Sequence, residues 1–244
     1  MRQLLPTWCD EADPYDVYRP ADPHGPLLRL NMIATVDGAV RDERGRAGGL
    51  GDEGDRKLFR TLRALADGIL VGAGTVRVEG YRPHRLRPDL ARRREADGRA
   101  APSPVIVVSR SLAFDLNAPL FTEARTPTVV VTCAEAPPER RRAIKRVGRV
   151  VVAGERDVDL PQAIAALRGE LGLAQLLCEG GPTLNAGLLA GGLVDELCLT
   201  IAPKMAGPGQ LGLAAGPIPA RSLELVSLCE QDDELYARYR LSAG

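Results

Sequence analysis

The sequence predicts one α/β domain built on a mixed, mostly parallel central sheet that helices flank. Short, continuous apolar runs alternate with helical segments along the middle of the chain, as in parallel strands joined by helices. Near the C-terminus, runs 223–228 and 235–241 are joined by 230–234, and the second run alternates apolar and polar residues, which predicts an antiparallel hairpin. No break after Gly25 is long enough to separate two domains, so we expect the domain over residues 27–244.

Residues 1–26 are predicted to form an extended N-terminal arm. Prolines recur in this segment among acidic and aromatic residues, a composition that disfavours a packed element. The aromatic side chains need a surface to lie on, and a second subunit is the candidate for providing it. These side chains are Trp8, Tyr15 and Tyr18.

The first part of the domain is expected to alternate strand and helix. The run 27–36 predicts a strand that ends in a tight turn. After the glycine-rich loop 45–54, an amphipathic helix is expected, capped by Asp52 or Asp55. A second short strand, 69–71, runs directly into a glycine turn and a helix start.

The rest of the chain continues the same alternation up to the hairpin. Its apolar runs are typical of buried strands, and the segments between them have helical periodicity. The strands are predicted at 105–108, 128–132, 150–153 and 194–203, and the helices at 137–147 and 160–171.

The stretch 176–185 combines a buried strand, a two-glycine turn and a helix start. Pro182 stands at the first helical position, where its missing N–H costs nothing. The first N–H groups of such a helix are unpaired, and glycines without a Cβ let an anion approach closely, so a phosphate fits there. Glu179 ends the strand, and a buried carboxylate is costly without a donor, so we interpret Glu179 as a ligand contact.

A simpler interpretation of the two glycines is a compact turn with no ligand. The dinucleotide fingerprint G-x-G-x-x-G is absent, so an ordinary Rossmann site is not supported. A second strand and glycine turn, at 69–75, repeats the arrangement of the first. A nucleotide site of another kind is therefore the hypothesis.

The charge balance favours small molecules as partners. With 32 basic and 32 acidic residues the net charge is zero, so no overall field favours nucleic acid or an anionic membrane. The arginine-rich segment 81–101 lacks interleaved aromatics and is interpreted as a solvated face, with an RNA or phosphate contact as the alternative. No apolar run reaches the roughly 18 residues of a membrane span. Residues 1–10 lack the pattern of a signal peptide, so we expect a cytoplasmic protein.

Cysteine and histidine usage disfavours metal and triad chemistry. The five cysteines are odd in number and scattered without metal-ligand spacing, so we expect reduced core residues. The two histidines, His24 and His84, lie in proline-rich segments, which disfavours a histidine metal site or a Ser-His-Asp triad. No metal is expected.

Several segments, taken in order, resemble the pyrimidine reductases of riboflavin synthesis. They are 30–38, 62–64 with 69–75, 179–184 with 193–197, and 202–204. The resemblance implies a dihydrofolate-reductase-like fold, an NADPH cofactor and a homodimer. It also implies hydride transfer to the sugar C1 of a phosphoribosylaminopyrimidine, as in a 5-amino-6-(5-phosphoribosylamino)uracil reductase. The chain lacks the H-x-E and P-C-x-x-C signature of the deaminase domain found in many members.

The same resemblance, together with the chemistry of the side chains, predicts a set of site residues. Asn31, Arg63 and Glu179 are expected to contact substrate, and Glu79 is nominated as proton donor or relay. Arg110, beside Ser109 at a strand end, is expected to hold the adenosine 2′-phosphate and to favour NADPH over NADH. The cofactor contacts implied are Ala34, Thr75, Ser109, Arg110, Gly180, Gly181, Pro182, Thr183, Leu184 and Asn185.

The substrate half departs from the family pattern at two places. Asn31 stands where many members have Lys, and Ala47-Gly48-Gly49 stands where they have Ser-x-Trp. Two alternatives to the pyrimidine reductase therefore remain open. One is a pterin reductase of the dihydrofolate reductase type, and the other is a non-catalytic NADPH-binding paralogue.

Overall fold

The computed structural model describes residues 1–99, 101–207 and 212–242, so residues 100, 208–211 and 243–244 of the predicted domain lie outside the described part. The strands are β1 (Arg2–Leu5), β2 (Leu27–Thr35), β3 (Gly68–Gly72), β4 (Val105–Val108), β5 (Val129–Thr132), β6 (Arg149–Val152), β7 (Gln175–Cys178), β8 (Glu196–Ala202), β9 (Leu223–Gln231) and β10 (Glu234–Leu241). The helices are α1 (Pro14–Tyr18), α2 (Glu53–Leu65), α3 (Ala73–Glu79), α4 (Pro88–Ala96), α5 (Pro119–Thr122), α6 (Pro138–Ile144), α7 (Leu160–Gly169) and α8 (Pro182–Ala190).

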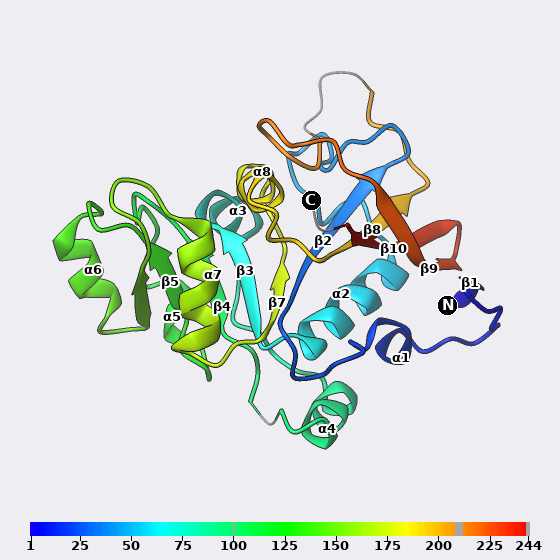
Figure 1. Cartoon of the computed structure of the whole chain (residues 1–244), viewed down its shortest axis with the longest axis horizontal. Coiled ribbons are helices and arrows are strands. Elements are labelled where there is room, and N and C mark those ends of the chain that lie inside the picture. The colour runs from blue at the N-terminus through cyan, green and yellow to red at the C-terminus, as the bar shows by residue number, and fades with distance from the viewer. Residues whose placement is uncertain (100, 208–211, 243–244) are drawn as a thin grey trace.

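All the strands of the described residues belong to one 10-stranded sheet that runs through the molecule (Figure 1). Its order is β1-β9-β10-β8-β2-β7-β3-β4-β5-β6. Neighbouring strands are parallel from β8 to β6, and the pairs β8–β10, β10–β9 and β9–β1 are antiparallel. The predicted mixed, mostly parallel sheet with a C-terminal antiparallel hairpin is therefore confirmed.

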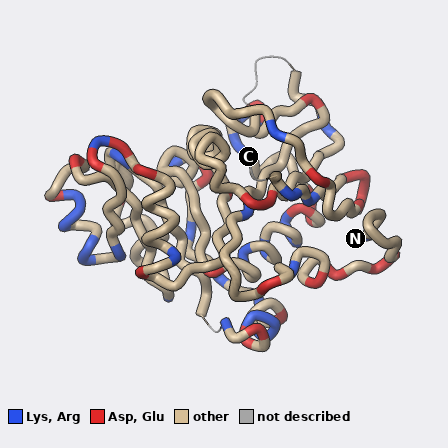
Figure 2. The backbone as a smooth tube through the Cα atoms, in the orientation of Figure 1, with Lys and Arg blue, Asp and Glu red and all other residues tan. Residues whose placement is uncertain are grey.

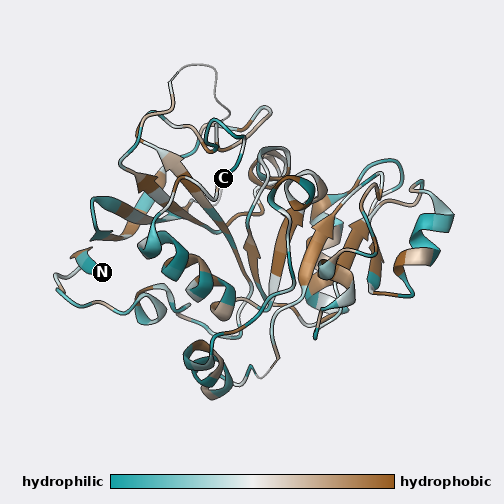
Figure 3. Ribbon diagram, turned by 180° about the vertical axis from the view of Figure 1, so that it is seen from behind, coloured by the Kyte–Doolittle hydropathy of each residue, from teal (hydrophilic) through white to brown (hydrophobic). Residues whose placement is uncertain are grey.

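Helices cover both faces of the parallel strands. On one face, α7 and α8 bury Leu167 and Leu188 against β2, β4 and β7. On the other face, α2 buries Leu58, Leu62 and Leu65 on one half of the sheet, and α5 and α6 cover the other half. Figure 3 shows the consequence, with apolar strands in the middle and polar helix surfaces outside. Strands covered on both faces are apolar at every position, which is why β4 and β5 read as continuous runs.

The N-terminal residues differ from the predicted extended arm. β1 pairs with β9, and α1 is capped by the Asp13 side chain, which accepts from the N–H of Tyr15 at 2.9 Å. Tyr15 and Tyr18 are buried against α2 and β10 of the same chain, whereas Trp8 is exposed. The prolines did not prevent this packing, because Pro14 occupies the first helical turn, where it is tolerated.

The arginine-rich segment after α3 is partly helical and only partly solvated. It forms α4, and Figure 2 shows basic residues gathered on α4 and on α6. Arg94 departs from the solvated-face interpretation, because it is buried and its Nη1 donates to the carbonyls of Ala64 and Ala66.

Within the described ranges, no helix combines the length and apolar character needed to cross a membrane.

Four of the five cysteines follow the prediction of reduced core residues, and Cys9 does not. Cys133, Cys178, Cys198 and Cys229 are buried, and Cys9 is exposed. Burial raises the pKa of the Cys178 thiol to about 12, so this group stays protonated at neutral pH.

Candidate active site

The two predicted glycine turns meet at the carboxyl ends of β3 and β7. The N–H of Gly72 donates to the carbonyl of Gly180 at 2.7 Å. Gly180 has φ +89°, in the left-handed region that favours glycine. At Gly181 an added Cβ would lie 2.5 Å from Thr75 Oγ1, so the absence of a side chain lets this turn pack directly on α3. The sequence therefore uses its glycines to bring two strand–turn–helix units into contact.

Each glycine turn leads into a helix whose N-terminus receives no side-chain cap from the residues that the structure describes. The N–H groups of a first helical turn have no partner within the helix and attract anions. Thr183 is exposed in the first turn of α8, whereas Pro182 and Leu184 are buried beneath it. Asn185 is also fully buried, and its Nδ2 donates to the carbonyl of Leu213 at 2.7 Å. The structure thus gives the Asn185 side chain a role inside the protein.

A cavity of about 410 Å³ lies beside the glycine turns. Residues from β2, α2 and α3 line it, together with the segments that follow α3 and β7. Five of the predicted site residues are among its lining: Asn31, Arg63, Thr75, Glu79 and Glu179. The structure therefore brings together the substrate and catalytic residues that the sequence nominated.

An ion pair between Arg63 and Glu179 forms one wall of this cavity. Arg63 Nε donates to Oε1 at 2.6 Å and Nη2 donates to Oε2 at 2.7 Å, which is a bidentate geometry. Tyr81 Oη donates to the same carboxylate at 2.6 Å. The guanidinium also stacks 4.2 Å from the centroid of the Phe59 ring. Arg63 is thus fixed within the site instead of being solvated on its helix.

Burial and charge shift the ionisation of the groups around this pair. Burial acts to lower the pKa of the Arg63 guanidinium, but the charge and hydrogen bonds of Glu179 outweigh it and raise that pKa. Burial, followed by the charge of Glu179, raises the pKa of Tyr81 well above its usual value. Burial, followed by the positive charges of Arg63 and Arg94, lowers the pKa of His84 to about 3. At neutral pH, His84 is therefore neutral and Tyr81 remains a hydrogen-bond donor.

Glu79 and Asn31 lie on other parts of the cavity wall. Glu79 is the last residue of α3, and its Oε1 accepts from the N–H of Ala47 at 3.0 Å. This contact ties α3 to the glycine-rich loop. Asn31 projects from β2 and is buried, and its Oδ1 has no hydrogen-bond partner in the described ranges. A buried amide oxygen without a donor is costly, so this atom is available to a ligand.

The remaining predicted cofactor residues lie at the carboxyl ends of neighbouring strands. Ala34 is buried near the end of β2. Ser109 directly follows β4, and its Oγ accepts from the N–H of Leu112 at 3.0 Å. Arg110 is exposed and lies 3.0 Å from Asp157, also exposed. Arg110 therefore lies on the surface in a weak ion pair, and a phosphate can take the place of Asp157 in it.

Comparison with known proteins identifies the family. The family model described as the RibD C-terminal domain matches residues 26–236. The chain belongs to this family of riboflavin-biosynthesis pyrimidine reductases. The 2,5-diamino-6-ribosylamino-4(3H)-pyrimidinone 5′-phosphate reductase of Methanothermobacter thermautotrophicus is 36% identical over 182 residues, which are 75% of this chain and 80% of that protein.

Solved structures agree with this membership. A pyrimidine reductase-like protein from Corynebacterium diphtheriae superposes with a TM-score of 0.83 at 29% identity and covers 95% of this chain and 99% of that chain. Acinetobacter baumannii RibD superposes with a TM-score of 0.72 at 18% identity, over 90% of this chain and 58% of that chain, and at that identity it shows the fold alone.

The sequence motifs do not predict some of the residues that line or support this cavity. Tyr81 was assigned to a solvated loop, and Phe59 was not singled out. Asp55 was considered only as a helix cap, yet it lines the cavity and accepts from Thr200 Oγ1 at 2.8 Å. Helical spacing offers one signal, because Asp55, Phe59 and Arg63 recur every four residues and so share a face of α2.

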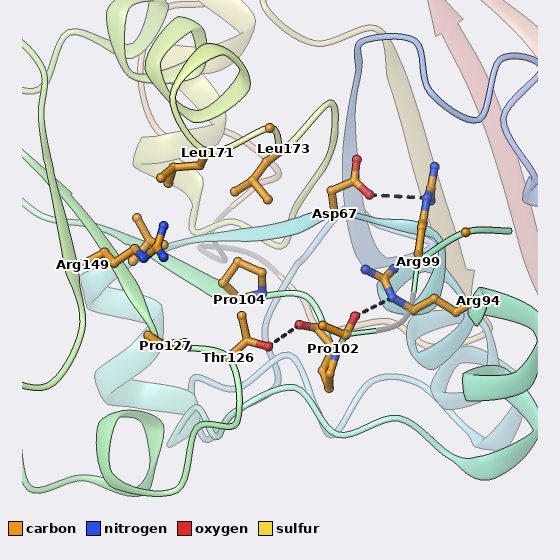
Figure 4. Close-up of a pocket in the computed structure, with 14 residues that line it drawn as sticks. Asp67, Arg94, Arg99, Pro102, Pro104, Thr126, Pro127, Arg149, Leu171 and Leu173 are labelled. Atoms are coloured by element: carbon orange, nitrogen blue, oxygen red, sulfur yellow. Dashed lines mark hydrogen bonds and ion pairs between the residues drawn. The ribbon is translucent and has the colours of Figure 1, made fainter.

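A second cavity, of about 380 Å³, lies at the other end of the parallel strands from the first (Figure 4). Pro104, Pro127 and Leu173 line it, and each precedes a strand, so the cavity is at the amino ends of the parallel strands. Its arginines are used internally: Arg94 Nε donates to the carbonyl of Ala101 at 2.8 Å, and Arg99 Nε lies 3.4 Å from Asp67. Ligands of open α/β sheets bind at the carboxyl ends instead, which favours the first cavity.

Proposed function

We propose that the protein is an NADPH-dependent reductase of a ribosylaminopyrimidine phosphate in riboflavin synthesis, acting as a homodimer in the cytoplasm, with residues 27–244 as the reductase domain. The observation that carries the proposal is the cavity in which the Arg63–Glu179 pair lies directly beside the double glycine turn. The printed name of the Methanothermobacter relative, a reductase of such a phosphate, supports it.

The residues around the glycine turns fit a dinucleotide. We propose that the glycine turn 180–181, the first turn of α8 (182–185) and Thr75 of α3 hold the pyrophosphate, because the chain there offers uncapped N–H groups and close backbone approach. Ala34 and Ser109 would flank the cofactor, and Arg110 would hold the adenosine 2′-phosphate. When bound, NADPH supplies the hydride.

The cavity walls fit a pyrimidine that bears a sugar phosphate. Glu179 fixes the guanidinium of Arg63 through Nε and Nη2, so its orientation is set before substrate arrives. We propose that Arg63 and Glu179 act as one unit that contacts substrate, with Arg63 Nη1 turned to its phosphate. Asn31 would contribute its unpartnered Oδ1. Because hydrogen bonds within the protein already hold the Arg63 and Glu179 side chains, binding of the substrate costs little conformational entropy in these two residues.

Hydride transfer to the sugar C1 acts on an imine form of the substrate, and the nitrogen bonded to C1 must then take up a proton. Our proposal has one candidate donor for this proton. Glu79 lines the cavity next to Thr75, and only Oε1 of its carboxyl group is engaged by the N–H of Ala47 within the described ranges. The second oxygen is free to exchange a proton with substrate or water.

The test is NADPH oxidation by the purified protein with 2,5-diamino-6-ribosylamino-4(3H)-pyrimidinone 5′-phosphate, with dihydrofolate, and with no acceptor. The proposal expects turnover with the pyrimidinone phosphate and a large loss of kcat/KM in Glu179→Gln. Turnover with dihydrofolate alone would assign a pterin reductase, and cofactor binding without turnover of either compound would assign a non-catalytic protein. Sedimentation of the same sample tests the homodimer.

A further inference from the structure

Asp55 places a carboxylate on the wall of the cavity that lies beside the glycine turns. It belongs to the first turn of α2 and lines the cavity together with Asn31 and Phe59. Its Oδ1 accepts from Thr200 Oγ1 at 2.8 Å. Thr200 lies on β8 opposite Ile33 of β2, another cavity residue, so the sheet itself fixes the orientation of the carboxylate.

The second carboxylate oxygen faces space that the sequence keeps open. A Cβ at Gly51 would lie 2.5 Å from Asp55 Oδ2, so any side chain at position 51 would crowd that oxygen. Gly51 also lines the cavity. In the described part of the chain, no side chain or N–H donates to Oδ2. Asn31 Oδ1 is buried without a hydrogen-bond partner among the described residues. Asp55 Oδ2 and Asn31 Oδ1 are therefore two acceptors on the cavity wall to which none of the described residues donates.

The surroundings of Asp55 make a donor more valuable there. Glu234 is buried behind it and is held by Tyr236 Oη at 2.6 Å and by the N–H of Asp52 at 2.9 Å. Burial, followed by the charges of Glu234 and Asp52, raises the pKa of the Asp55 carboxyl, while Thr200 and Arg56 act in the opposite sense. A carboxyl group in this position is poorly solvated and gains from a ligand that supplies N–H groups.

A 2-aminopyrimidin-4-one and a uracil present different groups to a carboxylate. A 2-aminopyrimidin-4-one presents an amino group and a ring N–H side by side, and these two donors match the two oxygens of a carboxylate. A uracil presents a carbonyl oxygen in place of that amino group, so a carboxylate there meets an acceptor. A site built to pair with one edge rejects the other, because it leaves buried groups unpaired.

We propose that Asp55, positioned by Thr200 and assisted by Asn31, binds the amino and ring N–H edge of a 2-aminopyrimidinone and selects it over the corresponding uracil. This inference rests on the proposed function, because it takes the same cavity to hold the pyrimidine. It favours the 2-amino compound over the uracil compound that the sequence resemblance implies, and it gives α2 the specificity-determining residue.

The experiment measures binding of two 5′-phosphates by calorimetry to the protein and its variants, in the presence of NADP⁺, which cannot donate a hydride, so that no turnover adds to the heat of binding. The probes are 2,5-diamino-6-ribosylamino-4(3H)-pyrimidinone 5′-phosphate and 5-amino-6-(5-phosphoribosylamino)uracil. The native protein should bind the 2-amino compound about tenfold to hundredfold more tightly, the discrimination expected of one good bidentate pair. Asp55→Asn should abolish or invert this ratio, because its amide can donate to the uracil carbonyl.

Two further variants separate recognition from folding. Thr200→Val should reduce the preference, because the Asp55 carboxylate stays in the chain but loses the hydrogen bond that orients it. Glu53→Gln, which changes an exposed carboxylate on the same helix, should retain the preference. Urea unfolding of each variant checks that the protein is folded. Binding of the 2-amino compound without turnover would keep this inference and reject the proposed reductase activity. Equal binding of the two probes, binding of neither, or an equal loss for both in Asp55→Asn would overturn the inference.

Discussion

Arg63 and Glu179 are joined by two parallel hydrogen bonds, of 2.6 and 2.7 Å, between the end of α2 and the residue that follows β7. The two residues are 116 positions apart in sequence. Their pairing brings α2 onto the carboxyl edge of the sheet, and Tyr81 closes the pair from the segment after α3. The site therefore depends on a contact that holds two distant parts of the chain together.

Arg63→Lys should damage the site although it keeps the charge. An ammonium cannot make the planar two-point contact with Glu179, so the carboxylate and the substrate groups would shift. We expect kcat/KM to fall by about a hundredfold, the effect of misplacing reacting groups by roughly an ångström. Steady-state kinetics measure this, with Arg60→Lys on the exposed side of α2 as control. Equal rates for both variants would remove Arg63 from the site.

Arg110→Ala should weaken NADPH binding and leave NADH binding unchanged. A charge-assisted contact with a phosphate contributes about 1.5–3 kcal/mol, so Kd for NADPH should rise roughly tenfold to hundredfold. Asp157→Asn should act in the opposite direction, because it removes the carboxylate that pairs with Arg110. Calorimetry with each nucleotide measures both effects. Native protein that binds NADH as tightly as NADPH would contradict the assignment.

Gly181→Ala should disturb the contact between the two glycine turns. The new Cβ would lie 2.5 Å from Thr75 Oγ1, and overpacking of this kind costs about 1–3 kcal/mol. Urea unfolding should show this loss, and Thr75→Ala in the same chain should restore much of it. Gly169→Ala is the control, because nothing lies within 4 Å of a Cβ at that position of α7. Equal stability of Gly181→Ala and Gly169→Ala would show that close approach is not required.

Glu196→Gln should destabilise the fold. Glu196 lies buried between Arg29, at 2.6 Å, and Arg238, at 2.5 Å. Removing one member of a buried ionic group costs about 3–5 kcal/mol, because it leaves buried charge uncompensated. Urea unfolding at neutral pH measures the loss, and Glu224→Gln, in an exposed pair with Arg240, should change little.

The ion pairs of Glu196 with Arg29 and Arg238 also predict that the free energy of unfolding falls in acid. Burial acts to raise the pKa of Glu196, but hydrogen bonds and charges from Arg238 and Arg29 outweigh it and hold the pKa below its usual value of 4.5. Its stabilising contribution is therefore full above pH 4.5 and is lost as the pH falls through the lowered value. Unfolding free energies from pH 7 to pH 3 should fall more steeply in the native protein than in Glu196→Gln. Parallel curves would contradict this linkage.

Local patterns predicted much of the fold. The apolar runs of β4 and β5, the alternation in β10 and the glycine turn before α8 each have a short-range signal. The packed N-terminus has none, because Tyr18 is buried by α2 and β10, which are distant in sequence. Tyr81 and Asp55 were missed as cavity residues for the same reason, since their partners Glu179 and Thr200 are brought near only by the sheet order.

The most direct test of the reductase follows deuterium from NADPH that carries the label at both C4 positions, during a single turnover with the aminopyrimidinone phosphate. We predict one deuterium at C1 of the ribityl chain in the product, and a much slower transfer in Glu179→Gln. Product without deuterium at that carbon, or deuterium in the pyrimidine ring, would contradict hydride transfer to the sugar in the cavity between α2 and the glycine turns.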